Sequence, residues 1–86
     1  MTHHTTPDFW ERYGRLPARV QRTADKNYAL LKDDPRHPSL HFKPLGDELW
    51  SVRVGIHHRA LATREGGVHL WFWIGTHAEY DRLIGT

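Results

Sequence analysis

Two arginines, a histidine and a tyrosine are the side chains of this sequence best suited to chemistry. Arg53 and Arg59 carry planar guanidinium groups, which can clamp two phosphate oxygens and stay charged at any working pH. Histidine titrates near neutrality, at about 6.5 in model peptides, so His77 is a candidate general acid or base. Tyr80 follows one helical turn later. Simpler interpretations stay open: ion-paired arginines, a strand-end histidine bonded to backbone, and a core tyrosine.

Hydrophobic alternation over Leu49–His77 predicts three antiparallel strands that position these side chains. Trp50, Val52 and Val54 alternate with polar residues, the period of two typical of a strand with one buried face. Gly66-Gly67 permits a hairpin turn. The following run, Val68–Ile74, is almost wholly apolar, which favours a central strand.

Strand parity predicts which side chains share a face, because alternate residues of a strand point to opposite sides. The face toward the core is expected to hold Trp50, Val52, Val54, Leu70, Phe72 and Ile74. The opposite, open face is expected to hold Ser51, Arg53, Arg59, Leu61, Trp71, Trp73 and His77. Without the register between strands, their convergence is a hypothesis. An open face with two tryptophans would also suit a protein partner.

Two helices are predicted before the sheet. Thr6 can cap the first, Pro7 suits its first position, and the helix is expected to run to Tyr13 before Gly14 ends it. Pro17 restarts a longer helix that Asp34-Pro35 stops. Its apolar positions recur at close to helical spacing: Leu16, Val20, Ala24, Tyr28 and Leu31. Its other face carries Arg19, Arg22, Lys26 and Lys32, which are either solvated or contact nucleic acid.

The segment between the helices and the sheet predicts a linker and a first strand. Two prolines in residues 33–39 prevent helix continuation, and Pro38 makes a helical zinc pair of His37 and His41 implausible. Leu40, Phe42 and Leu45 are expected to form the first strand, from which Lys43 projects. Pro44 confines part of it to an edge.

Length and composition predict one domain spanning residues 1–86, with residues 1–6 frayed. The net charge is only +2, although the arginines cluster. The absence of cysteine excludes disulfides and thiolate metal sites, and no apolar run is long enough for a signal peptide or membrane span. We expect a cytoplasmic protein without metal or other cofactor.

The sequence DPRHPSLHFKPLGDELWSVRVGIHHRAL, followed by WFWIGTHAEYDRL, resembles the RelE/ParE superfamily of bacterial toxins from type II toxin-antitoxin systems. The similarity extends from Phe9 onward and rests on the joint occurrence of WSVRVG, an arginine on the next strand, and GTHAEYD. It implies an α+β fold in which two N-terminal helices pack on a twisted three- to four-stranded antiparallel sheet, with a short C-terminal helix over Ala78 to Ile84. It also implies cleavage of messenger RNA, usually on the ribosome, and a cognate antitoxin as partner.

RNA cleavage through the chain's own 2′-hydroxyl needs a base, an acid and cations around the phosphate. The resemblance implies His77, Arg59, Arg53 and Tyr80 as catalytic residues. Residues expected to bind RNA are Lys43, Arg53, His58, Arg59 and Trp73. The chain departs from the family where it has His58 instead of a tyrosine and Ser51 instead of a lysine. Two alternatives remain: a ParE-like toxin acting on a protein such as gyrase, and an inactive binding module paired with an antitoxin.

Overall fold

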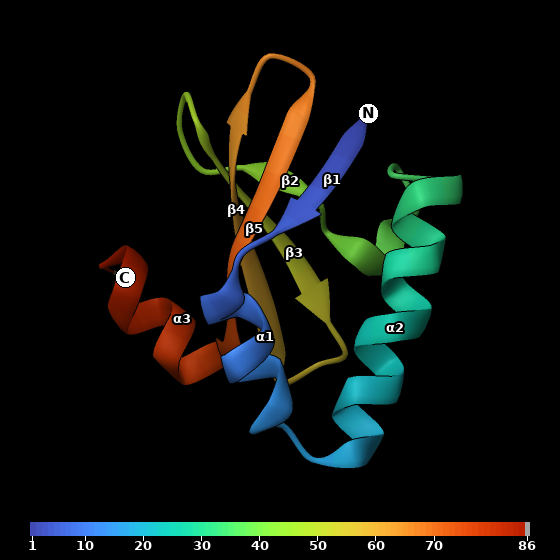
Figure 1. Ribbon diagram of the computed structural model, residues 1–86, viewed down its shortest axis with the longest axis vertical. Coiled ribbons are helices and arrows are strands. Elements are labelled where there is room, and N and C mark those ends of the chain that lie inside the picture. The colour runs from blue at the N-terminus through green and yellow to red at the C-terminus, as the bar shows by residue number, and fades with distance from the viewer. Residues whose placement is uncertain (86) are drawn as a thin grey trace.

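The computed structural model describes residues 1–85, which form three α-helices and a five-stranded sheet (Figure 1). In chain order the elements are β1 (Thr2–Thr5), α1 (Pro7–Gly14), α2 (Ala18–Asp33), a short 3₁₀ helix η1 (Pro38–Leu40), β2 (Lys43–Pro44), β3 (Leu49–Val54), β4 (His58–Glu65), β5 (Val68–Thr76) and α3 (His77–Ile84). The strands lie in the order β1-β5-β4-β3-β2. The predicted α+β architecture is confirmed, with one strand more than the prediction allowed.

The additional strand is β1, and it shows that the prediction of a frayed N-terminus was wrong for Thr2–Thr5. β1 pairs in parallel with β5, from Thr2 opposite Val68 to Thr5 opposite Trp71. The ring of His3 stacks on the ring of His69, with centroids 5.4 Å apart. These contacts hold a polar segment at the sheet edge that has no apolar alternation for a sequence pattern to detect.

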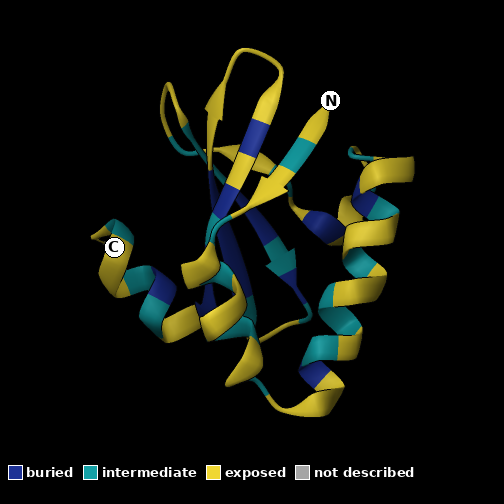
Figure 2. Ribbon diagram, in the orientation of Figure 1, coloured by how far each residue is buried: buried dark blue, intermediate teal, exposed yellow. Residues whose placement is uncertain are grey.

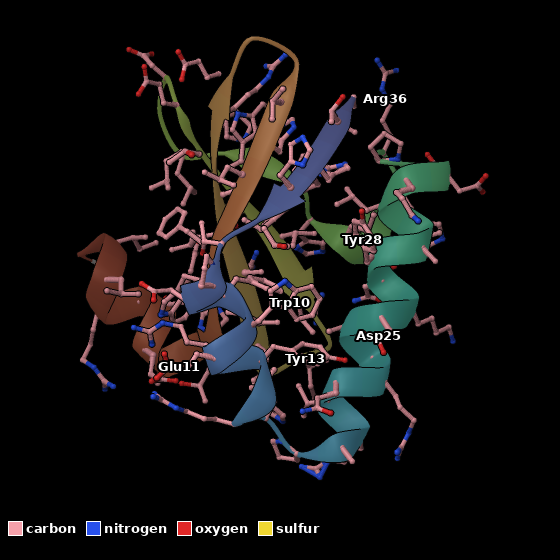
Figure 3. All side chains as sticks on the ribbon, viewed as in Figure 1. Trp10, Glu11, Tyr13, Asp25, Tyr28 and Arg36 are labelled. Atoms are coloured by element: carbon pink, nitrogen blue, oxygen red, sulfur yellow. The ribbon has the colours of Figure 1, made fainter. Side chains whose placement is uncertain are left out.

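Both N-terminal helices form where the sequence predicts them. Thr6 Oγ1 accepts a hydrogen bond from the backbone nitrogen of Phe9 at 3.1 Å, so α1 has the expected cap. α2 begins directly after Pro17 and ends at Asp33, before Pro35. The two helices are joined by the hydroxyl of Tyr13, which donates to Asp25 Oδ1 at 2.7 Å (Figure 3).

The core lies between these helices and the sheet, and it confirms the parity predicted for β3. Val52 and Val54 are buried there together with Ala60 and Ala62 of β4. Figure 2 shows the buried stretches of the central strands in dark blue. β3 and β4 are antiparallel, with Val52 opposite Ala60. Ser51 and Arg53 therefore belong to the other face, as predicted.

The parity predicted for β5 was wrong in its first half because a β-bulge interrupts the strand. Leu61 pairs with Trp73 but Ala62 pairs with Trp71, so Phe72 is an extra residue. Trp71 consequently points into the main core, and Leu70 is 38% exposed. Beyond the bulge the prediction holds, because Ile74 is buried in the main core.

The predicted first strand is much shorter than expected. Leu40 lies in η1, and β2 contains only Lys43 and Pro44. His41 adopts a left-handed backbone with φ of 43°, which breaks the extended run. Pro44 further limits pairing because it has no N–H to donate.

The second face of the sheet, expected to be open, is partly covered by α3. Leu61, Trp73 and Tyr80 form a second buried cluster there. Figure 1 shows α3 on the opposite side of the strands from α2. None of the helices in the described part of the chain has the length and apolar character needed to cross a membrane.

Candidate active site

The candidate residues meet on the face of the sheet that α3 covers. Strand register places Arg53 opposite Arg59, and Arg59 opposite Gly75. A neighbouring row runs from Lys43 through Ser51 and Leu61 to Trp73. Gly75 leaves room for this packing, because a Cβ atom there would lie 2.6 Å from the Trp73 ring and 3.0 Å from Glu79 Oε1.

Arg59 is the most unusual of these side chains, because it is only 8% exposed and belongs to no ion pair within residues 1–85. Its Nη1 donates to Ser51 Oγ at 3.4 Å, and its guanidinium carbon lies 5.2 Å from the centre of the Tyr80 ring. Its Nε is buried without a hydrogen-bond partner. A buried guanidinium with an unpaired N–H group is suited to bind an anion, because an uncompensated buried charge is unfavourable.

Ser51 and Tyr80 complete a buried polar network with Arg59. The Tyr80 hydroxyl donates to Ser51 Oγ at 3.3 Å, and Ser51 is fully buried. One serine oxygen thus accepts from both catalytic candidates. Sequence parity placed Ser51 on this face, but its burial was missed because it depends on where α3 packs.

His77 begins α3 at the exposed rim of this network. Its ring centre lies 5.7 Å from that of Tyr80, and its Nδ1 lies 3.1 Å from Asp81 Oδ2. With the carboxylate of Asp81 on Nδ1, the Nε2 atom is the one left to exchange a proton with a substrate. The same contact is an ion pair when the imidazole is protonated.

A capping box fixes the start of α3 and thereby the position of His77. Thr76 Oγ1 accepts from the backbone nitrogen of Glu79 at 3.1 Å, and Glu79 Oε1 accepts from the backbone nitrogen of Thr76 at 3.0 Å. The backbone nitrogen and the hydroxyl of Thr76 both donate to the Glu79 carboxylate, and these hydrogen bonds lower the pKa of Glu79. The backbone nitrogen of His77 also donates to the carbonyl of His57 at 2.7 Å.

Arg53 lies at the edge of β3, beside His41. Its Nε donates to the carbonyl of Gly55 at 3.1 Å, and its Nη1 lies 3.4 Å from His41 Nε2. The carbonyl of Arg53 accepts from Asn27 of α2. The guanidinium is partly exposed and holds no carboxylate among the described residues, so it too can receive a phosphate.

The structure brings together five of the seven residues predicted for the site: Arg53, Arg59, His77, Tyr80 and Lys43, the last exposed on β2 opposite Ser51. His58 pairs with Val54 and so points to the other face, where burial lowers its pKa. Trp73 is on the correct face but only 5% exposed. Trp73 is thus buried, whereas His58 is partly exposed on the opposite face.

The arrangement can perform proton transfer beside a bound phosphate. Two guanidinium groups lie on paired residues, and a histidine oriented by a carboxylate stands at the rim. Within residues 1–85, no group of three or more histidine, aspartate or glutamate side chains is placed to hold a metal ion.

Several solved toxins share this fold. The YoeB/ParE toxin from Agrobacterium tumefaciens is 21% identical with a TM-score of 0.68, covering 90% of this chain and 99% of its own. RelE in the RelB-RelE antitoxin-toxin complex from Methanococcus jannaschii is 12% identical with a TM-score of 0.72, covering 92% and 96%. YafQ from E. coli is 13% identical with a TM-score of 0.72, covering 91% and 94%. No curated protein sequence matches the chain.

A family model gives the stronger evidence, because it compares the sequence with a whole family rather than one fold. The model of the ParE-like toxin domain matches residues 18–82, which include β2 to β5, α2 and most of α3. The chain therefore belongs to the ParE-like toxin domain family, within the RelE/ParE superfamily of toxins.

Proposed function

We propose that this toxin is a metal-independent endoribonuclease that cleaves messenger RNA on the translating ribosome. The observation that carries the proposal is Arg59, a buried guanidinium without a carboxylate partner that contacts Tyr80 and Ser51. A buried guanidinium without a carboxylate partner is suited to bind a phosphate whose negative charge grows in the transition state. A buried arginine whose role is to stabilise the fold is better paired with a carboxylate.

Each residue has a distinct role in the proposed reaction. Arg59 and Arg53 hold the non-bridging oxygens of the scissile phosphate while the neighbouring 2′-hydroxyl attacks it. His77 exchanges a proton through Nε2, and Asp81 orients its ring through Nδ1. Tyr80 holds the Arg59 guanidinium against its ring. The products are a 2′,3′-cyclic phosphate and a 5′-hydroxyl.

RNA enters along the exposed rim near β2. Lys43 is exposed there, opposite Ser51, and contributes a charge to the phosphate backbone on either side of the cleaved bond. The rest of the chain is nearly neutral, with a net charge of +2. Binding therefore depends on local cations and on the ribosome, and we place the activity in the cytoplasm.

A cognate antitoxin is the proposed protein partner. The RelE homologue with this fold was solved as an antitoxin-toxin complex. Trp10 is 52% exposed and Tyr28 is 44% exposed on the face of α1 and α2. Exposed aromatic rings of this size are typical of surfaces that a partner covers.

Single-turnover cleavage of messenger RNA on programmed ribosomes tests the proposal. His77→Ala should lower the rate about 10²- to 10⁴-fold by removing proton transfer. Arg59→Met keeps an apolar stem of similar length against Tyr80, and it should lower the rate without changing the shape of the pH profile. Arg19→Ala, on the exposed face of α2, is the control and should change salt sensitivity more than rate.

The family name itself favours a second candidate, a ParE-like toxin that acts on a protein target such as gyrase. Growth arrest distinguishes the two. If His77→Ala and Arg59→Met still arrest growth and the wild type leaves messenger RNA intact, the protein-target function replaces the nuclease.

A further inference from the structure

His41 adopts a left-handed backbone conformation where η1 ends. With φ of 43°, it is the one non-glycine residue of the described chain whose φ is positive. It follows η1 directly and its side chain is exposed. Residues held in such a conformation are concentrated at functional sites.

The conformation brings His41 to the end of the arginine row. The β2–β3 ladder begins at Lys43, opposite Ser51, and His41 lies two residues before it. The side chain of His41 reaches β3 there, because its Nε2 lies 3.4 Å from Arg53 Nη1. His41 thus stands beside Arg53, on the side away from Arg59.

His41 and His77 consequently flank the two arginines. Arg53, Arg59 and Gly75 form one row across β3, β4 and β5, His41 contacts Arg53 at one end, and His77 follows Gly75 by two residues. Neighbouring strands are about 4.8 Å apart, so the three paired residues span roughly 10 Å between backbones. Two imidazoles reaching inward from its ends can contact the same phosphodiester from opposite sides.

The contact with Arg53 also bears on the nitrogen that a base would use. A guanidinium only donates, so a hydrogen bond between these two groups has His41 Nε2 as its acceptor. A lone pair on an imidazole nitrogen is what a general base requires. In the free protein, His41 Nε2 faces Arg53 Nη1.

We propose that His41 is the general base of the cleavage reaction and that substrate binding unmasks it. The proposal rests on the proposed endoribonuclease function. When the scissile phosphate takes the guanidinium of Arg53, Nε2 of His41 is released. It removes the proton of the 2′-hydroxyl, whose oxygen forms the new bond to phosphorus. The bond from phosphorus to the 5′-oxygen breaks, and His77 donates the proton that this oxygen takes up.

Replacement by glycine tests the assignment, because glycine adopts a positive φ without strain and His41→Gly should keep the fold. The single-turnover rate should fall about 10²- to 10⁴-fold. Added imidazole should restore part of it, since the side chain is exposed and leaves room for a small base. Binding of an uncleavable 2′-deoxy messenger analogue should be unchanged. His4→Gly, at an exposed histidine of β1, is the matched control and should retain the wild-type rate.

The pH profile separates a base from a residue that only positions Arg53. If His41→Gly loses the part of the pH–rate profile in which the rate rises with pH, and keeps the part that is due to His77, His41 is supported as the base. A profile of unchanged shape, or a rate that imidazole does not raise, overturns the assignment while the nuclease function stands. Wild-type protein that fails to cleave overturns the nuclease function and this assignment with it.

Discussion

Ser51 links the two buried side chains of the site through a single hydroxyl oxygen. It accepts from Arg59 Nη1 at 3.4 Å and from the Tyr80 hydroxyl at 3.3 Å, and it is fully buried. The family resemblance implies a lysine at this position. In this chain the smaller residue leaves space for the Arg59 guanidinium beneath α3.

Ser51→Ala should lower the free energy of unfolding by about 1–3 kcal/mol. The substitution leaves the Tyr80 hydroxyl and one Arg59 donor buried without their acceptor, and lost partners of buried groups have costs of that size. Urea denaturation measures it. Ser39→Ala, at an exposed serine of η1, should change stability by no more than about 0.5 kcal/mol. Equal effects of the two substitutions would show that the Ser51 network does not stabilise the fold.

The sequence predicts most of the residues that the structure brings together in the candidate site, but not how they are arranged. Arg53, Arg59, His77 and Tyr80 were found from residue type, parity and resemblance. The burial of Arg59 was missed because it depends on α3 lying over the sheet. His41 was considered only as a metal ligand, since its left-handed backbone and its contact with Arg53 leave no mark on periodicity.

At the scale of elements, β1 is joined to the sheet through two stacked histidines. Trp71 Nε1 donates to His3 Nδ1 at 2.9 Å, while His3 Nε2 and both nitrogens of His69 are buried without partners. Burial lowers the pKa of His3, with further contributions from the N-terminal amine and Lys32 of α2. Burial also lowers the pKa of His69, with contributions from His3, Arg64 of β4 and the N-terminal amine.

The stability of the fold should therefore decrease as the pH falls below about 6.5, the ordinary value for histidine. The pKa values of His3 and His69 in the folded protein lie below this value, so the unfolded chain binds more protons as the pH falls. The stability that the two neutral histidines contribute is therefore complete above about pH 6.5 and is lost as the pH falls toward their folded pKa values. Urea denaturation at pH 7.5 and pH 5 measures the difference. His69→Phe keeps an aromatic ring and should reduce the dependence, leaving the parts due to His3 and His58.

The control for this pH effect is His4→Phe, at the exposed histidine next to the stack. It should keep the full pH dependence. If both His69→Phe and His4→Phe lose stability as steeply as the wild type when the pH falls, the histidine stack does not cause the pH dependence of stability.

We expect the stability of α3 to depend on its capping box, because the helix has only eight residues and helices this short are marginal on their own. Thr76→Ala removes the cap of the backbone nitrogen of Glu79 and should destabilise the protein by about 0.5–2 kcal/mol. Amide exchange in α3 should accelerate, and the Tyr80 ring should become more accessible. Glu79→Gln keeps an acceptor oxygen for the Thr76 nitrogen and is the control. Exchange as slow in Thr76→Ala as in Glu79→Gln would contradict the role of the Thr76 side chain.

The elements themselves could be predicted to different degrees for physical reasons. α1 and α2 have caps, prolines and a helical stripe, so their ends were predicted to within one residue or so. The first half of β5 was misassigned because a bulge changes parity without changing composition. β1 was missed because its pairing comes from a strand more than sixty residues away in sequence.

At the scale of the whole molecule, α2 packs on the sheet through Val20 and Leu31, which lie in the main core. A partly open cavity of about 350 Å³ lies between α1, α2 and the sheet, walled by Trp10, Tyr13, Ala24 and Tyr28 over a floor that includes Val52. Figure 3 shows the labelled aromatic side chains of α1 and α2 along this region. Ala24 has the smallest side chain in the apolar stripe predicted for α2, and it leaves this space unfilled.

Filling this cavity should stabilise the free protein, because a small domain buries only about 60–65% of its unfolded surface and an unfilled apolar space reduces stability further. Ala24→Leu, which extends a side chain from α2 into the cavity, should raise the free energy of unfolding by about 0.5–2 kcal/mol. Thermal and urea denaturation measure it.

Ala29→Leu introduces the same side chain on the exposed face of the same helix, so it controls for helix propensity and should change stability by no more than about 0.5 kcal/mol. A loss of stability in Ala24→Leu but not in Ala29→Leu would mean that α2 lies closer to the sheet in solution. The larger side chain would then be overpacked, and the exposed rings of Trp10 and Tyr28 would have to be explained without the cavity.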